Sequence, residues 1–199
     1  VLYLAVGSVY TGNVAAATEW KRANDRAERL TIIDTGAASG RLGLLAVATA
    51  RYAGGTADTA AVIRFARANR ERCQEYVFLD RLHYLAAGGR LSKGSAFFGD
   101  MLHMKPVISP QPDGARKMGV VRDRAGQLRF ALERLEEGLQ GVEKALIMLE
   151  YTDNLPWVAE TVRPAIASRY PGVEIILNPM SLTSGAHMGP GTWGVAFLP

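Results

Sequence analysis

A short segment near the end of the chain, His187-Met188-Gly189-Pro190-Gly191, has residue types that could bind an anion. An imidazole can donate a hydrogen bond and titrates near neutral pH, so His187 is a candidate donor to a carboxylate or a phosphate. Glycine allows unusual backbone angles and proline fixes its own φ, so we expect a stiff loop at the mouth of a sheet to carry this histidine. The alternative is a tight surface turn with an exposed histidine, and the spacing alone does not separate the two.

A second candidate for anion binding is the segment 7–13, which lies between a predicted strand and a predicted helix. The N–H groups at the start of a helix are unpaired and carry positive partial charge, so they readily bind carboxylates and phosphates. Thr11 adds a hydroxyl donor, and Gly12 allows a ligand to approach the backbone. The other interpretation is that Thr11 or Asn13 caps the helix, which does not exclude binding.

Two arginines could also contact an anion. Arg90 follows the pair Gly88-Gly89, and such a pair ordinarily ends a helix. Arg90 is therefore either an anion ligand or a surface charge, and Arg122, which follows a predicted hairpin, has the same two interpretations.

Four apolar residues recur at helical spacing in the middle of the chain: Phe97, Phe98, Met101 and Leu102. This pattern most often marks packing against a core. Methionine and phenylalanine also form adaptable walls around flexible apolar ligands. The four residues are thus candidates for the core or for the lining of a pocket for a flexible apolar ligand.

The sequence shows no pattern typical of a catalytic or metal site. Carboxylates follow strands or helices singly, and His83 and His103 lack partners at metal-ligand spacing. A Ser-His-Asp order, a phosphate-binding loop and a dinucleotide fingerprint are all missing from the sequence. From these residues we therefore expect no catalytic constellation, metal or cofactor.

The composition narrows the classes of partner. Of the 199 residues, 48% are hydrophobic and 21% charged, as in ordinary globular proteins. The net charge of +4 comes without a Lys/Arg block interleaved with aromatics, so we expect no nucleic acid partner. Cys73 is the only cysteine, which favours a buried bystander in a reducing cytoplasm. The longest apolar stretch, residues 42–50, is far shorter than the roughly 20 residues of a membrane span.

Alternating strand and helix patterns must position these residues. Short strands separated by helices in the first half predict a parallel sheet, in which ligands bind beyond the carboxyl ends of the strands. Gln111-Pro112-Asp113-Gly114 predicts the turn of a β-hairpin. The predicted strands are 1–6, 30–34, 76–79, 107–109, 117–121, 145–149, 173–178 and an apolar tail after residue 191, and the predicted helices are 13–29, 41–52, 59–72, 82–87, 95–102, 127–139 and 155–168.

We expect two α/β units, residues 1–82 and 83–199. The first contains the parallel sheet with flanking helices, and the second contains the hairpin and the closing His-Met-Gly-Pro-Gly segment. The chain starts inside an apolar strand without a methionine. We therefore expect it to be a piece of a longer protein that lacks the start of its first unit.

Taken together and in order, these segments resemble the DegV family of bacterial fatty-acid-binding proteins. The family's Tyr-Leu-x-x-Gly-Gly-Arg pattern matches residues 84–90, its apolar-Lys-Pro-apolar strand matches 104–108, and its closing His-x-Gly-Pro-Gly-x-x-Gly pattern matches 187–194. Arg122 matches a basic residue after the hairpin, while residues 11–13 and 32–35 resemble its Ser-Gly-Thr and strand-to-Asp-Thr steps. Three departures stand out: Thr11 replaces serine, Asn13 replaces threonine and His103 replaces asparagine, and the family's opening strand and Thr-Ser loop are absent.

The resemblance implies a DegV-like architecture of two α/β lobes that enclose one long-chain fatty acid, with Phe97, Phe98, Met101 and Leu102 around its acyl chain. Its carboxylate would lie near Thr11, Gly12 and His187, with Arg90 or Arg122 close by. The resemblance also implies that the bound acid is offered to a separate kinase related to dihydroxyacetone kinase, which forms the acyl phosphate.

Two other functions remain open at this point. The first is an enzyme of the dihydroxyacetone kinase or phosphotransferase type, in which His187 would hold substrate or phosphate covalently. The second is a regulatory or interaction domain with a degenerate pocket. A bound acyl ligand would favour the carrier, whereas phosphoryl transfer to His187 would favour the enzyme.

Overall fold

The computed structural model describes residues 1–90 and 104–199. Within these residues, eight strands form two sheets. The predicted helix 95–102 and the proposed acyl-chain residues Phe97, Phe98, Met101 and Leu102 lie outside the described residues.

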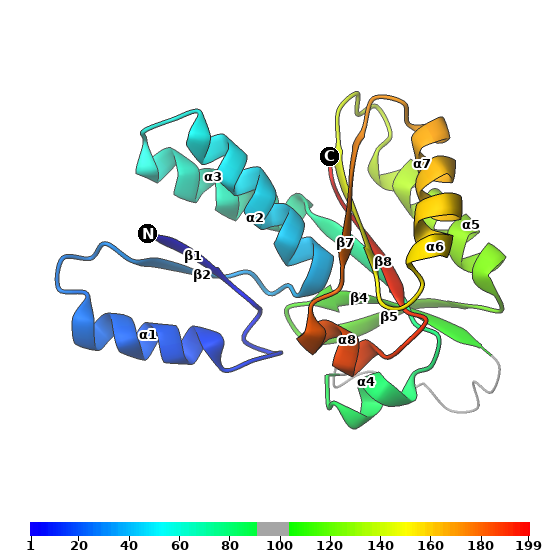
Figure 1. Cartoon of the computed structure of the whole chain (residues 1–199). Coiled ribbons are helices and arrows are strands. Elements are labelled where there is room, and N and C mark those ends of the chain that lie inside the picture. The colour runs from blue at the N-terminus through cyan, green and yellow to red at the C-terminus, as the bar shows by residue number, and fades with distance from the viewer. Residues whose placement is uncertain (91–103) are drawn as a thin grey trace.

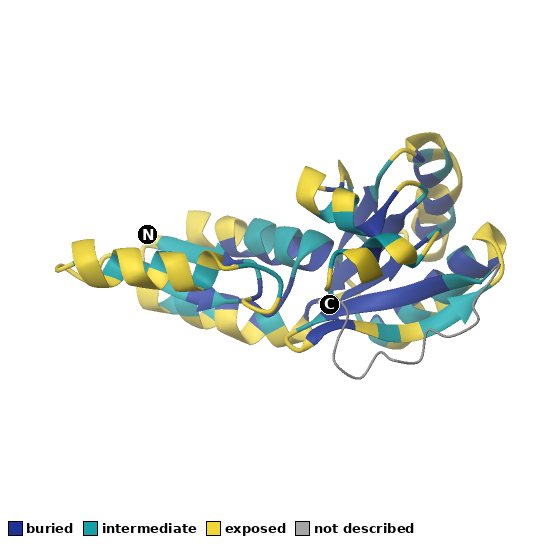
Figure 2. Ribbon diagram, turned by 90° about the horizontal axis from the view of Figure 1, so that it is seen from below, coloured by how far each residue is buried: buried dark blue, intermediate teal, exposed yellow. Residues whose placement is uncertain are grey.

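The smaller sheet is a parallel pair near the N-terminus (Figure 1). β1 (Leu2–Ala5) pairs with β2 (Thr31–Asp34), and α1 (Asn13–Asn24) connects them. This confirms the predicted strand–helix–strand order and its parallel pairing. No residue of α1 is buried, and Figure 2 shows exposed residues along that helix.

The larger sheet has the order β5-β4-β3-β8-β6-β7, and its pairs are antiparallel except for the parallel pair β6–β7. β4 and β5 form the predicted hairpin, with Pro112 and Asp113 in its turn. The strands are β3 (Gln74–Phe78), β4 (Lys105–Gln111), β5 (Gly114–Val121), β6 (Leu146–Tyr151), β7 (Glu174–Pro179) and β8 (Trp193–Leu198).

The third predicted strand does not extend the parallel pair. β3 lies in the larger sheet instead, antiparallel to both β4 and β8. A short apolar run indicates a buried strand but does not encode its neighbours, which are chosen by packing far along the chain. β3 precedes the division predicted at residue 82, and that division stays a prediction.

Helices cover both faces of the larger sheet. One core lies between the sheet and the helices α5 (Arg124–Gly138) and α7 (Arg163–Arg169), and Leu135, Ile166 and Phe197 belong to the same buried cluster there. On the other face α2 (Ser39–Gly54) packs against β6 and β8, and α3 (Thr59–Arg72) packs beside α2. Because side chains alternate along a strand, Met148 and Glu150 of β6 point to the α2 face while Leu149 points to the α5 face.

Three short helical segments complete the second half. α4 (His83–Ala87) agrees with its prediction, and α6 (Leu155–Trp157) continues through the π-helical turn η1 (Val158–Val162) into α7, as the single predicted helix 155–168 requires. α8 (Leu182–Met188) was not expected. In the described part of the chain, no helix is long and apolar enough to cross a membrane.

The expectation that a loop carries His187 is wrong, because this residue lies in the last turn of α8. Ser181 caps the start of α8 by accepting a hydrogen bond from the Ser184 amide at 3.1 Å. The helix ends at Gly189, whose φ of 80° suits only glycine. The Gly-Pro-Gly segment therefore terminates a helix that presents the histidine.

Candidate functional site

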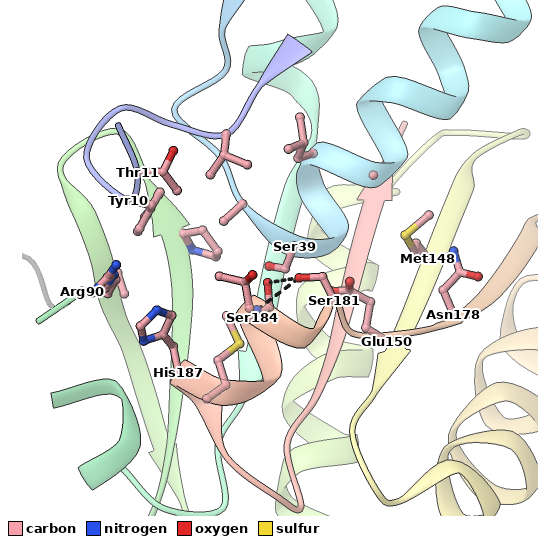
Figure 3. A pocket seen from close by; sticks show the side chains of 18 of the residues that line it. Tyr10, Thr11, Ser39, Arg90, Met148, Glu150, Asn178, Ser181, Ser184 and His187 are labelled. Carbon is pink, nitrogen blue, oxygen red and sulfur yellow. Dashed lines mark hydrogen bonds between the residues drawn. The ribbon is translucent and has the colours of Figure 1, made fainter. Parts of the chain in front are cut away.

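A cavity of about 800 Å³ lies where the loop after β1, helix α2, the hairpin β4–β5 and helix α8 meet (Figure 3). Its wall is mainly apolar. Its apolar lining includes side chains from α2, α4 and the large sheet: Leu42, Ala46, Val47, Leu85, Ile108 and Met148.

Three of the five predicted head-group residues line this cavity: Thr11, Arg90 and His187. In Figure 3 they lie toward one side of it, while Met148 lies toward the opposite side. The cavity therefore has a cation and two polar groups at one end, while the rest of its wall is mainly apolar but includes Glu150 and Asn178.

His187 is held beside the end of α4 by two glycines. A Cβ atom at Gly88 would lie 2.3 Å from Nδ1 of His187, and one at Gly189 would lie 2.1 Å from Cδ2 of Tyr84. Both positions therefore require glycine for the two segments to approach so closely. This contact explains how Gly88-Gly89-Arg90 and His187, far apart in sequence, reach one site.

Arg90 is half-buried and anchored to the hairpin. Its carbonyl accepts a hydrogen bond from the Ala115 amide at 3.0 Å, and its Nη1 donates to the Gly88 carbonyl. Among the described residues, no carboxylate forms a salt bridge with Arg90. The guanidinium is therefore a cation at the cavity wall that an anionic ligand can pair with.

Thr11 lines the cavity just before α1, and its predicted role as a donor to the ligand stays a prediction. Its Oγ1 accepts a hydrogen bond from the Asn13 amide at 3.2 Å, so the hydroxyl proton can still be donated to a ligand. Gly12 is the N-cap residue of α1 and is exposed, and it does not line the cavity. The local role of Thr11 at the start of α1 and a ligand contact are thus compatible.

Tyr10 is a cavity residue that sequence reasoning missed. Its hydroxyl donates to the Gln111 carbonyl at 2.7 Å and accepts from the Gln111 amide at 2.8 Å. Burial raises the pKa of Tyr10, so the neutral phenol keeps both bonds. The pair joins the loop after β1 to the hairpin across 101 residues, a separation that no local pattern could reveal.

Two glutamates beside the cavity were also missed. Glu150 lines it, Glu75 lies next to Glu150, and both are buried. Burial raises the pKa of both carboxyls, that of Glu150 well above its usual range. Glu75 follows Gln74 at the start of β3 and Glu150 lies near the end of β6, so no local pattern in the sequence marks the two as a pair.

Arg122 is placed elsewhere. It is exposed and lines a separate, smaller hollow with Arg129 and Glu133 at the junction of β5 and α5.

Cys73 is 1% exposed, and burial raises the pKa of its thiol to about 12, as expected for an inert bystander. In the described ranges, no group of histidine, cysteine or carboxylate side chains could hold a metal ion.

The whole chain, residues 1–199, matches the family model described as an uncharacterised protein of the DegV family. A DegV domain-containing protein of Clostridium perfringens is 27% identical over 203 residues, which cover 100% of this chain and 69% of that protein.

Solved structures show the same fold. A Thermus thermophilus DegV family protein, described by its fatty acid binding, matches with a TM-score of 0.89 and 24% identity over 99% of this chain and 70% of that one. The Streptococcus pneumoniae Fatty Acid Kinase (Fak) B3 protein, loaded with linoleic acid, matches with a TM-score of 0.87 and 16% identity over the same shares. The chain belongs to the DegV family.

Proposed function

We propose that the cavity binds one long-chain fatty acid. Its carboxylate would pair with Arg90 and accept hydrogen bonds from Thr11 and His187, and its acyl chain would lie along α2 and the sheet. The observation that carries this proposal is the combination in one 800 Å³ cavity of a half-buried arginine without an acidic partner among the described residues and a long apolar wall. DegV proteins of the same fold that are described as fatty-acid-binding support it.

The acyl chain and the carboxylate contribute very different free energies to binding. Each buried methylene contributes ~0.8 kcal/mol, so about fourteen of them contribute on the order of 10 kcal/mol before ordering costs. A charge-assisted hydrogen bond adds only ~1.5–3 kcal/mol. The acyl chain therefore sets the affinity, and the head-group residues set the position of the carboxylate.

We further propose that the bound acid is offered to a separate kinase, related to dihydroxyacetone kinase, which forms the acyl phosphate. Support comes from the structural relative described as the B3 protein of a fatty acid kinase. In this role the chain positions a carboxylate and transfers no phosphoryl group itself.

His187→Ala tests this role. With saturating palmitic acid and the kinase, we expect acyl-phosphate formation to fall about tenfold or more, because the carboxylate loses a hydrogen bond that orients it. Binding of palmitic acid should weaken less, since the acyl chain sets the affinity. Unchanged turnover would contradict the role given to His187, and a phosphorylated His187 in the wild type would favour the enzyme instead.

A further inference from the structure

Two glutamates meet on the α2 face of the large sheet. Glu75 lies on β3 and Glu150 on β6, the two strands that flank β8, and they are 1% and 5% exposed. Their partners in the strand register are Ala196 and Gly194 of β8. Because these two residues are small, the carboxyl groups can reach each other across the central strand.

The first turn of α2 donates hydrogen bonds to both carboxyls. Glu75 accepts from the Ser39 hydroxyl at 2.7 Å, the Gly40 amide at 3.1 Å and the Arg41 amide at 3.0 Å. Glu150 accepts from the Gly40 amide at 2.7 Å. A Cβ atom at Gly40 would lie 2.7 Å from Oε2 of Glu150, so the helix backbone sits directly on the pair.

The distribution of donors identifies which carboxyl carries a proton. Oε1 of Glu75 and Oε2 of Glu150 accept from the same Gly40 amide, at 3.1 and 2.7 Å, so the two buried carboxyls lie side by side and cannot both be ionised without strong repulsion. Glu75 already accepts from three donors of α2, which is the environment of an anion. Glu150 has one such donor and is therefore the carboxyl that carries the proton.

Among the described residues, no cationic side chain pairs directly with either carboxyl. The Arg41 guanidinium donates to the carbonyls of Pro110 and Arg70, at 3.1 and 2.9 Å, rather than to a carboxyl. The other titratable groups that interact with Glu75 are Tyr10 and Cys73, and burial raises the pKa of both, so they stay neutral. In the described part of the chain neither glutamate forms a salt bridge, so ionising both would leave two adjacent buried charges.

We propose that Glu75 and Glu150 are positioning residues that share one proton, carried by Glu150, and that this pair holds the first turn of α2 against the sheet. The same helix supplies Ser39, Leu42 and Ala46 to the cavity wall. The pair thus fixes one wall of the ligand site, a consequence that rests on the proposed fatty-acid binding.

The dependence of stability on pH tests the shared proton. Because the folded-state pKa of Glu150 is raised, its contribution to stability is fully present below the ordinary glutamate pKa of about 4.3 and declines as the pH rises toward the folded value. Between the unfolded and the folded pKa of Glu150, each rise of one pH unit should increase the unfolding equilibrium constant by up to about tenfold, because one proton is involved. Glu150→Gln keeps a donor to Glu75 and an acceptor for Gly40 without a titrating proton.

We therefore expect Glu150→Gln to remove this decline in denaturant unfolding between pH 5 and 8, relative to the wild type. Glu174→Gln, at an exposed residue paired with Arg51, is the matched control and should keep the wild-type slope in this range. Glu75→Gln should be much less stable than Glu150→Gln, because an amide nitrogen cannot accept from the α2 donors. The proposal would be overturned if the stability of Glu150→Gln fell with pH as steeply as that of the wild type. It would also be overturned if Glu150→Gln were less stable than Glu75→Gln.

Infrared spectroscopy decides the same point without relying on how the variants fold. The native wild type at pH 7 should show the carbonyl band of a protonated carboxyl, and its absence would overturn the proposal. For the cavity wall, Glu75→Gln should weaken palmitic acid binding about tenfold, although Glu75 does not line the cavity, and unchanged affinity would overturn the positioning role. If the wild type binds no fatty acid, the proposed function fails, while unfolding and infrared data still decide the carboxyl pair.

Discussion

Trp193→Ala is expected to lower the free energy of unfolding by about 3–5 kcal/mol, the usual cost of removing a large buried aromatic side chain. Trp193 is 0% exposed, and its ring stacks on Phe78 with 4.2 Å between centroids. Its Nε1 donates to Oε1 of Gln127 at 3.0 Å, so the substitution also leaves a buried amide oxygen without its donor. Denaturant unfolding measures the change.

Trp20→Ala is the matched control, since it removes the same side chain from the surface of α1. Trp20 is 56% exposed, and no residue of that helix is buried. We expect a change within about 0.5 kcal/mol. Equal effects of the two substitutions would contradict the packing described for the large sheet.

Ala46→Trp is expected to weaken the binding of a long-chain fatty acid about a hundredfold. Ala46 lines the cavity seven residues after Ser39, which places it roughly 10 Å further along the axis of α2. An indole there would occupy the path of about four methylenes, each contributing ~0.8 kcal/mol when buried. Calorimetric titration with palmitic and octanoic acids measures the loss, which should be small for the shorter acid.

Ala50→Trp provides the control on the same helix, because Ala50 is exposed and does not line the cavity. It should leave the affinity for both acids within about twofold of the wild type. A loss that is equal for the two acids in Ala46→Trp would mean that the acyl chain does not extend along α2.

Much of the fold could be predicted from local patterns. The helix predicted at 59–72 agrees with α3, and the turn residues after Gln111 produce the expected hairpin. The placement of β3 could not be predicted, because it depends on antiparallel partners 30 and 120 residues away rather than on its own apolar run. α8 was missed because Gly185 and the following Gly-Pro-Gly segment weaken a helical pattern that Ser181 and the packing against α4 stabilise.

The candidate site was predictable where one residue signalled its own chemistry. Thr11, Arg90 and His187 were identified as separate candidates, and the fold brings them to one cavity. Arg122 looked equivalent to Arg90 in sequence, yet it lines another hollow, because it follows the end of β5 beside α5. The Glu75–Glu150 pair had no such signal, since it arises only when two strands flank a strand with small side chains.

The proposed site binds a fatty acid in this cavity by its carboxylate at Arg90. Calorimetric titration of palmitic acid into delipidated protein tests it most directly, with Arg90→Gln and Arg122→Gln compared with the wild type. We predict one acid per chain, about tenfold weaker binding in Arg90→Gln, and unchanged binding in Arg122→Gln. No binding by the wild type, or a loss confined to Arg122→Gln, would contradict the account.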